Sequence, residues 1–232
     1  MDRGAFDNVW LLFNCKMRHF LPFILTACMA CALHAQHNAV TKEQAAIIRE
    51  ISAASAKIVS MESDFVQTKY ITMLNDKLVS KGKIRFQQPD KLLWEYTTPY
   101  TYSFIINNNK IKIRNNNRTD IIDSNHNKVF KEISRLMMMT VRGNSLTDDK
   151  VFDVTVKSEK KAQGKGQEYQ AILVPKRKEM KQLWNRLVLH FDVANKILST
   201  IEMFEKNGDH TIIEMQHVVL NKAIDSNVFN VD

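Results

Sequence analysis

The feature that most constrains the fold is the alternation of apolar and polar residues over residues 65–99. Ile84 and Phe86 fall on one face of an extended segment, and Lys83 falls on the other. Alternation with period two, interrupted by turn residues such as those at 75–76, is typical of antiparallel strands joined in sequence. The apolar face is rich in large side chains, so it must pack either against other elements of the chain or against a bound molecule.

The same pattern continues through most of the chain. Asparagine clusters separate the early segments, and Asn207-Gly208 between two alternating segments is a strong hairpin signal. The alternation predicts strands at about 64–74, 77–88, 91–97, 100–107, 110–115, 118–123, 150–158, 168–175, 184–192, 197–206 and 209–220.

Two segments show helical spacing instead. In residues 41–60, Ile47, Ile51 and Ile58 recur on one face behind Thr41, a residue type that caps helix N-termini. In residues 127–142 the apolar face includes three successive methionines. Methionine suits an apolar surface that must adapt to its partner, although ordinary core packing is the simpler explanation. Three in a row cannot all face one way.

These elements predict the fold class. A sheet of about 10–11 antiparallel strands curls rather than stays flat, and two helices can cover its concave face. We therefore expect an α+β domain, in which a strongly curved antiparallel sheet forms an unclosed β-barrel with a helical lid.

The first 35 residues have the pattern of a secretory signal peptide. A basic lead at residues 16–19 precedes a short apolar segment and small residues that end at Ala35. Met17 is an alternative start. In a second interpretation Cys28 is lipidated, because residues 25–28 resemble a lipobox. Cleavage after Ala35 predicts one exported periplasmic domain over residues 36–232.

Cysteine content and charge exclude several classes of function. Cys15, Cys28 and Cys31 all lie in the leader, so the processed domain would lack a disulfide, a thiolate nucleophile and a cysteine metal site. The formal net charge of +8 favours weak attraction to anionic surfaces, or plain solubility. No arginine-rich tract or aromatic RNA-binding motif occurs, so nucleic acid is not an expected partner.

The sequence also lacks a catalytic pattern. The histidines after residue 35 have no spacing that brings two metal ligands together, and His210 and His217 fall on opposite faces of a regular strand. There is no Gly-x-Ser-x-Gly, phosphate loop or glycine-rich dinucleotide turn. We expect no enzyme activity, no metal and no cofactor.

The order and spacing of several residues resemble a known family. The matching positions are Phe65-x-Gln67, then Gly82-x-Ile84-x-Phe86-x-x-Pro89-x-x-Leu92-x-Trp94-x-Tyr96-x-x-Pro99, and a tail of Asn221-x-x-Ile224-Asp225-x-x-x-Phe229. In this order, together with the apolar helix between the strands, they are similar to the periplasmic outer-membrane lipoprotein carrier family, LolA.

This resemblance implies a monomeric carrier that hides the acyl chains of lipoproteins in a hydrophobic cavity. It implies shuttling from an inner-membrane ABC lipoprotein-release complex to an outer-membrane acceptor. A carrier or sensor of another lipid, such as a polyene or glycolipid chain, is the alternative, and a domain plugged by its own side chains is a third.

One position departs from the family pattern. In relatives an arginine directly precedes the proline that matches Pro89, and it holds the lid shut, whereas this chain has Gln88. Glutamine can still donate hydrogen bonds but carries no charge. The resemblance thus makes Gln88 the candidate lid-control residue.

The candidate cavity residues combine the apolar helix faces with the inward face of the strands. They are Ile47, Ile51, Ile58, Ile84, Phe86, Leu92, Trp94, Tyr96, Phe104, Leu136, Met137, Val141, Leu189 and Phe191. An error of one residue in the expected register of a strand would place all the candidate residues of that strand on the other face of the sheet.

Overall fold

The computed structural model describes residues 41–115, 117–141, 146–161 and 166–232. Residues Lys42–Asp232 form one compact unit. The predicted signal peptide over residues 1–35, including Cys28 and Ala35, lies outside the described residues. Cleavage, lipidation and the boundary of the exported domain at residue 36 therefore stay predictions.

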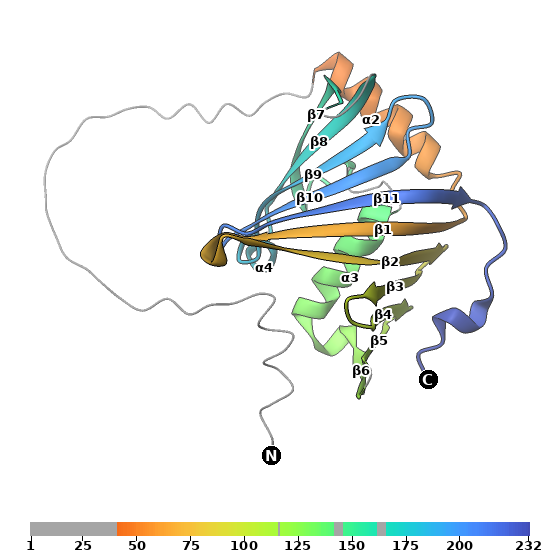
Figure 1. Cartoon of the computed structure of the whole chain (residues 1–232). Helices are drawn as coiled ribbons and strands as arrows, with labels where there is room; N and C mark the ends of the chain where they lie inside the picture. The colour runs from red at the N-terminus through yellow and green to blue at the C-terminus, as the bar shows by residue number, and fades with distance from the viewer. Residues whose placement is uncertain (1–40, 116, 142–145, 162–165) are drawn as a thin grey trace, which may run out of the picture. The chain divides into compact units, whose positions relative to one another are not determined.

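Within the described residues, eleven strands form one antiparallel sheet in the order β6-β5-β4-β3-β2-β1-β11-β10-β9-β8-β7 (Figure 1). The strands are β1 (Ser60–Ile71), β2 (Asp76–Gln87), β3 (Lys91–Thr98), β4 (Tyr102–Asn107), β5 (Lys110–Asn115), β6 (Thr119–Asp123), β7 (Phe152–Lys160), β8 (Gln167–Pro175), β9 (Trp184–Asp192), β10 (Leu198–Glu205) and β11 (His210–Leu220). The helices are α2 (Lys42–Ser55), α3 (Lys128–Val141) and α4 (Lys178–Lys181).

The strand order explains why a helix must cross the sheet. The chain runs outward from β1 to β6 by successive hairpins, and then returns from β7 to β11, which pairs with β1. The strands β6 and β7 are opposite edges, so the sheet is not closed. The segment between them contains α3 and connects one edge to the other.

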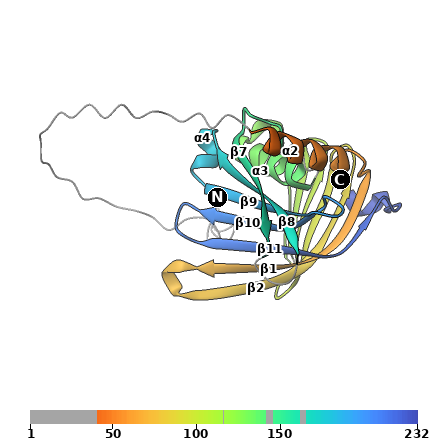
Figure 2. The same cartoon turned by 90° about the horizontal axis from the view of Figure 1, so that it is seen from above.

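Helices α2 and α3 lie on the same side of the sheet (Figure 2). We call the face that they cover the inner face. The C-terminal tail covers part of the outer face, where Phe229 is fully buried against Leu93 and Ile105. Ile224, another residue of the tail motif, packs beside it and is partly buried.

The predicted fold class is confirmed, and the predicted strands agree closely with the observed ones. Asn75 and Gly208 lie in the turns predicted for them, and both have positive φ angles, 49° and 90°. The predicted bound of the first helix was wrong, because α2 ends at Ser55 rather than at residue 60. Residues Ser60 and Met61 pair instead with Gln87 and Leu220, and this sheet pairing outweighs the helical spacing.

Candidate ligand-binding site

Most of the predicted cavity residues lie together in one apolar cluster on the inner face. The buried members are Ile47, Ile51, Ile58, Ile84, Phe86, Leu92, Trp94, Phe104, Leu136, Leu189 and Phe191. Tyr96 and Met137 are partly buried and pack against the cluster. The side chain of Val141 lies outside the described part of the chain. Whether this cluster receives a ligand stays a prediction.

The placement of Ile58 requires a correction. It is buried in the cluster as expected, but it lies after the end of α2 and not on the helix. It belongs to the short connection between α2 and β1, so it would not move as part of a rigid helix.

Three aromatic rings form the centre of the cluster and pack around a glycine. The ring centroid of Phe65 lies 5.2 Å from those of both Trp94 and Tyr96. Phe65 pairs with Gly82 across the strands, and a Cβ atom at Gly82 would lie 2.6 Å from the Phe65 ring. The ring therefore lies directly over the glycine, which explains the glycine in the Gly-x-Ile-x-Phe segment.

Helix α3 is held at the inner face by packing and by ion pairs. Arg177 beside α4 contacts Glu132 at 2.5 Å, and Arg135 contacts Asp148 at the same distance. Met137 and Met138 pack against the apolar cluster. Met139 instead lines a polar hollow with Arg135, so the three methionines do not share one direction.

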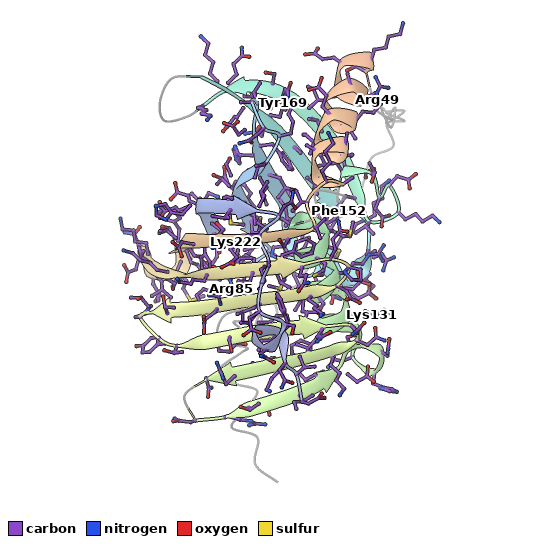
Figure 3. All side chains as sticks on the ribbon, turned by 90° about the vertical axis from the view of Figure 1, so that its right-hand side faces the viewer. Arg49, Arg85, Lys131, Phe152, Tyr169 and Lys222 are labelled. Atoms are coloured by element: carbon purple, nitrogen blue, oxygen red, sulfur yellow. The ribbon has the colours of Figure 1, made fainter. Side chains whose placement is uncertain are left out.

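Helix α2 packs against the edge strand β7. Its buried residues are Ile47, Ile51 and Ser55. Glu50 of this helix accepts a hydrogen bond from the hydroxyl of Tyr169 on β8 at 3.4 Å and lies 3.4 Å from Lys196. Figure 3 shows Tyr169 near α2, the helix that carries Arg49. Its N-terminal end leads into residues that the structure does not describe, and its C-terminal end leads directly into β1.

The connection after α2 is clamped from two strands. The Gln88 side chain, beyond the end of β2, donates a hydrogen bond from Nε2 to the Ile58 carbonyl at 2.9 Å. Asn221, beyond the end of β11, accepts from the Val59 N–H at 2.8 Å and donates to the Lys57 carbonyl at 3.1 Å. Gln88 thus contacts the hinge of α2, and its role in lid control stays a prediction.

The pocket described beneath the helices is small. A crevice between the C-terminal ends of α2 and α3 and strands β9 and β10 has a volume of about 10 Å³, with Ser55, Thr140 and Phe191 among its lining residues. That is room for about one water molecule, whereas pockets for drug-sized ligands measure about 300–1,000 Å³. A hollow of about 580 Å³ beside α3 is lined mostly by polar residues, including Arg135, Asp148 and Asp149. The crevice of about 10 Å³ cannot hold an acyl chain.

The inner face becomes polar toward the free end of the β1–β2 hairpin. Tyr96 donates a hydrogen bond to the Gln67 side chain at 2.8 Å, and burial raises the pKa of Tyr96 to about 12. Beyond it, Lys69 is buried with Glu205 at 2.8 Å and Asp209 at 3.4 Å. Buried charges are tolerated where they are paired in this way.

Sequence reasoning missed several residues of the site. Phe65 belongs to the family pattern but was not predicted to line the cavity, although its phase matches the buried face of β1. Asn221 belongs to the tail of the family pattern, but neither its contacts nor those of Glu50 were predicted, because they join segments far apart in the sequence: Asn221 lies 164 residues from Lys57. Only the pairing of β1 with β11 brings Asn221 to the hinge.

Two further observations concern chemistry and membranes. Among the described residues, no group of three or more His, Cys, Asp or Glu side chains is arranged to hold a metal ion. No helix in the described part of the chain has the length and apolar character needed to cross a membrane.

Comparison with known families shows which family this chain belongs to. The family model described as outer membrane lipoprotein carrier protein LolA matches residues 56–232. The chain belongs to the LolA family. The match begins directly after α2, so it includes the whole LolA sheet and α3 but not the first helix.

Several solved structures are similar to this chain at very low sequence identity. An uncharacterized conserved protein from Thermus thermophilus is 6% identical, with a TM-score of 0.51 over 82% of this chain and 94% of that one. A LolA superfamily protein from Nitrosomonas europaea is 7% identical, with a TM-score of 0.43 over 80% and 96% of the two chains. The lipoprotein LppX from Mycobacterium tuberculosis is 9% identical, with a TM-score of 0.44 over 81% and 97%. Among curated proteins, none matches the chain significantly.

Membership of the LolA family indicates a lipid- or lipoprotein-binding carrier rather than a particular cargo. Proteins of this family are generally periplasmic and generally not enzymes.

Proposed function

We propose that this protein is a periplasmic carrier that takes up the acyl chains of lipoproteins between its inner face and its helices. The observation that carries the proposal is a continuous apolar face covered by α2, a helix that the sheet holds through its C-terminal connection and a few side chains. Opening requires little rearrangement of the sheet, because α2 can turn about residues 56–59.

Helix α3 is less suited to move. Its two ends connect to the opposite edges of the sheet, and it carries ion pairs to Arg177 and Asp148. We therefore assign opening to α2 and the adaptable wall to α3, where Met137 and Met138 border the apolar cluster.

The energetics allow such an exchange. Exposing Ile47 and Ile51 costs about 1.5–3 kcal/mol for each side chain. One long acyl chain costs roughly 10 kcal/mol in water, at about 0.8 kcal/mol for each methylene. A bound chain can therefore offset the loss of α2 packing, while an empty carrier closes on itself and keeps its inner face out of water.

The route follows from the cargo. Free diffusion of an acylated protein through water is negligible at this cost, so the carrier collects cargo from an inner-membrane ABC release complex and delivers it to an outer-membrane acceptor. The protein acts as a monomer and needs no cofactor, because burial of hydrocarbon supplies the binding free energy.

Native mass spectrometry of the protein purified gently from periplasm tests this function. Co-purification of an acylated protein, released when a fluorescent fatty acid is added in excess, is the expected result. A small lipid in its place would indicate the alternative carrier or sensor. The absence of any bound species, together with no uptake of the fluorescent fatty acid, would contradict carriage of either ligand.

A further inference from the structure

The tip of the β1–β2 hairpin, residues 70–79, exposes an unusual number of large apolar side chains. Met73 is 75% exposed and Leu74 is 66% exposed, and both lie in the 3-10 turn that joins the strands. Tyr70, Leu78 and Val79 add exposed fractions of 43%, 39% and 43%. A concentration of this kind on one projecting element is a sign of an interaction site rather than of scattered surface residues.

The tip projects beyond strands β3 to β6. Pairing of β2 with β3 begins only at Lys81, so residues 76–80 have no partner on that side. Figure 1 shows the hairpin extending well past strands β3 to β6. The tip can therefore approach a flat surface without obstruction from those strands.

The tip is also held rigidly. Thr72 donates its hydroxyl hydrogen to the Gly208 carbonyl at 2.7 Å, and its N–H donates to Asp209 at 3.1 Å. Behind it, Lys69 is buried in contact with Glu205 and Asp209. These contacts keep Met73 and Leu74 from folding back onto the protein, which an unanchored apolar loop would do.

The charges around the tip are mainly positive. Lys77 lies within it, Lys81 follows it on β2, and Lys206 lies in the neighbouring turn whose Gly208 contacts Thr72; all three lysines are exposed. Asp76 is the exposed acidic residue of the tip. Lysines beside an apolar projection suit the headgroups and outer acyl region of an anionic lipid layer.

We propose that the hairpin tip docks the protein on an anionic phospholipid surface, with Met73 and Leu74 inserted at the boundary between headgroups and acyl chains. Tyr70 lies at headgroup depth, and the lysines contact lipid phosphates. Insertion is shallow, because the tip also carries Asp76 and Lys77 and residues 76–80 keep unpaired backbone groups on one edge. This inference goes beyond carriage and does not depend on what the inner face binds.

Vesicle flotation with the protein as recovered after export tests the docking. Vesicles of phosphatidylethanolamine and phosphatidylglycerol are compared with vesicles of phosphatidylcholine. We expect the wild type to favour the anionic vesicles, and Met73→Asp/Leu74→Asp to weaken partitioning by about tenfold or more. Ile121→Asp/Val219→Asp is the matched control, because these side chains are 54% and 46% exposed on other strands.

Lys77→Gln/Lys81→Gln should reduce the preference for anionic vesicles and its dependence on salt. Unchanged partitioning of Met73→Asp/Leu74→Asp, an equal loss in the control, or no binding by the wild type would overturn the proposal. Fluorescent fatty acid uptake by the same variants should be unchanged, which separates this outcome from a failure of the carrier function.

Discussion

At the scale of single residues, Gly82 shows how the inner face is built. Phe65 on β1 covers the glycine and contacts Trp94 and Tyr96 on β3, so three strands share one aromatic layer. The layer exists because position 82 has no side chain to occupy that space.

Gly82→Ala should therefore destabilise the protein. The new Cβ would lie 2.0 Å from the Glu95 carbonyl oxygen and 2.6 Å from the Phe65 ring, so backbone and ring must both shift. We expect a loss of about 2 kcal/mol or more in the free energy of unfolding, measured with urea. Lys83→Ala, one position along and 52% exposed, should change it by less than about 0.5 kcal/mol. Equal effects would contradict this account.

His190 shows a second residue-level arrangement, on the outer face. Its Nδ1 and Nε2 atoms each lie 2.8 Å from a carboxylate oxygen, of Glu168 and Glu202 respectively. His210 contacts the other oxygen of Glu202 at 2.9 Å. Burial lowers the pKa of His190, but its hydrogen bonds to Glu202 and Glu168 outweigh burial and raise it above the ordinary value of 6.5.

This arrangement predicts a pH dependence of stability. The pKa of His190 is higher in the folded protein than in the unfolded chain. Its contribution to the free energy of unfolding is therefore fully present below the unfolded pKa of about 6.5, and this contribution is lost as the pH rises through the folded pKa. Urea unfolding should show a decline in stability over this range that His190→Gln removes. His126→Gln, at a side chain that is 85% exposed, should leave the decline intact. A decline that persists in His190→Gln would refute the assignment.

At the scale of elements, α2 and its connection decide how the inner face opens. Gln88 and Asn221 hold residues 57–59 from two different strands, whereas the helix itself buries few side chains. The position that the family resemblance marked for lid control thus touches the hinge rather than the body of the helix.

Changes at Gln88 should alter ligand release in opposite directions. Gln88→Arg keeps a donor toward the Ile58 carbonyl and adds a charge and further donors near the helix C-terminus, so release should slow several-fold. Gln88→Leu removes the donor, so release should quicken. Stopped-flow displacement of a fluorescent fatty acid measures both. Equal rates in the two variants would show that this contact does not control opening.

The elements themselves could be predicted well from the sequence, and their contacts could not. Period-two alternation locates strands because one face of each is buried, and it also selected the inward residues of β2 and β3. The end of α2 was misplaced because Ile58 continues the helical spacing while Ser60 and Met61 are taken by strand pairing. The contacts of Asn221, Lys69 and Glu50 depend on long-range pairing, which no local pattern reveals.

At the scale of the whole molecule, the protein belongs to a family of lipid or lipoprotein carriers, and the crevice described beneath its helices measures about 10 Å³. Under the proposed carrier function, the helices and the sheet separate when a ligand enters.

Joining α2 to the sheet should therefore block uptake. Glu50 and Lys196 lie 3.4 Å apart, so Glu50→Cys/Lys196→Cys can be linked by a short, reducible thiol crosslinker once Cys15, Cys28 and Cys31 are removed with the leader or replaced by serine. We expect fluorescent fatty acid uptake to slow by about tenfold or more, corresponding to about 1.4 kcal/mol, and to recover on reduction.

The matched control links Asp153 and Lys176, an ion pair at 2.8 Å that does not involve α2. Crosslinked Asp153→Cys/Lys176→Cys should take up the fatty acid at the wild-type rate. Undiminished uptake with α2 linked would mean that the ligand enters elsewhere.

The pairing of β1 with β11 has a consequence for biosynthesis. The centre of the sheet joins the start of the folded unit to its end, with Asp64 beside Gln216. A chain emerging from its N-terminus cannot complete this centre until almost its whole length is available, and such distant pairing is intrinsically slow. The newly synthesised polypeptide thus cannot complete its central sheet until its last strand is made, and premature termination before that strand leaves the sheet incomplete.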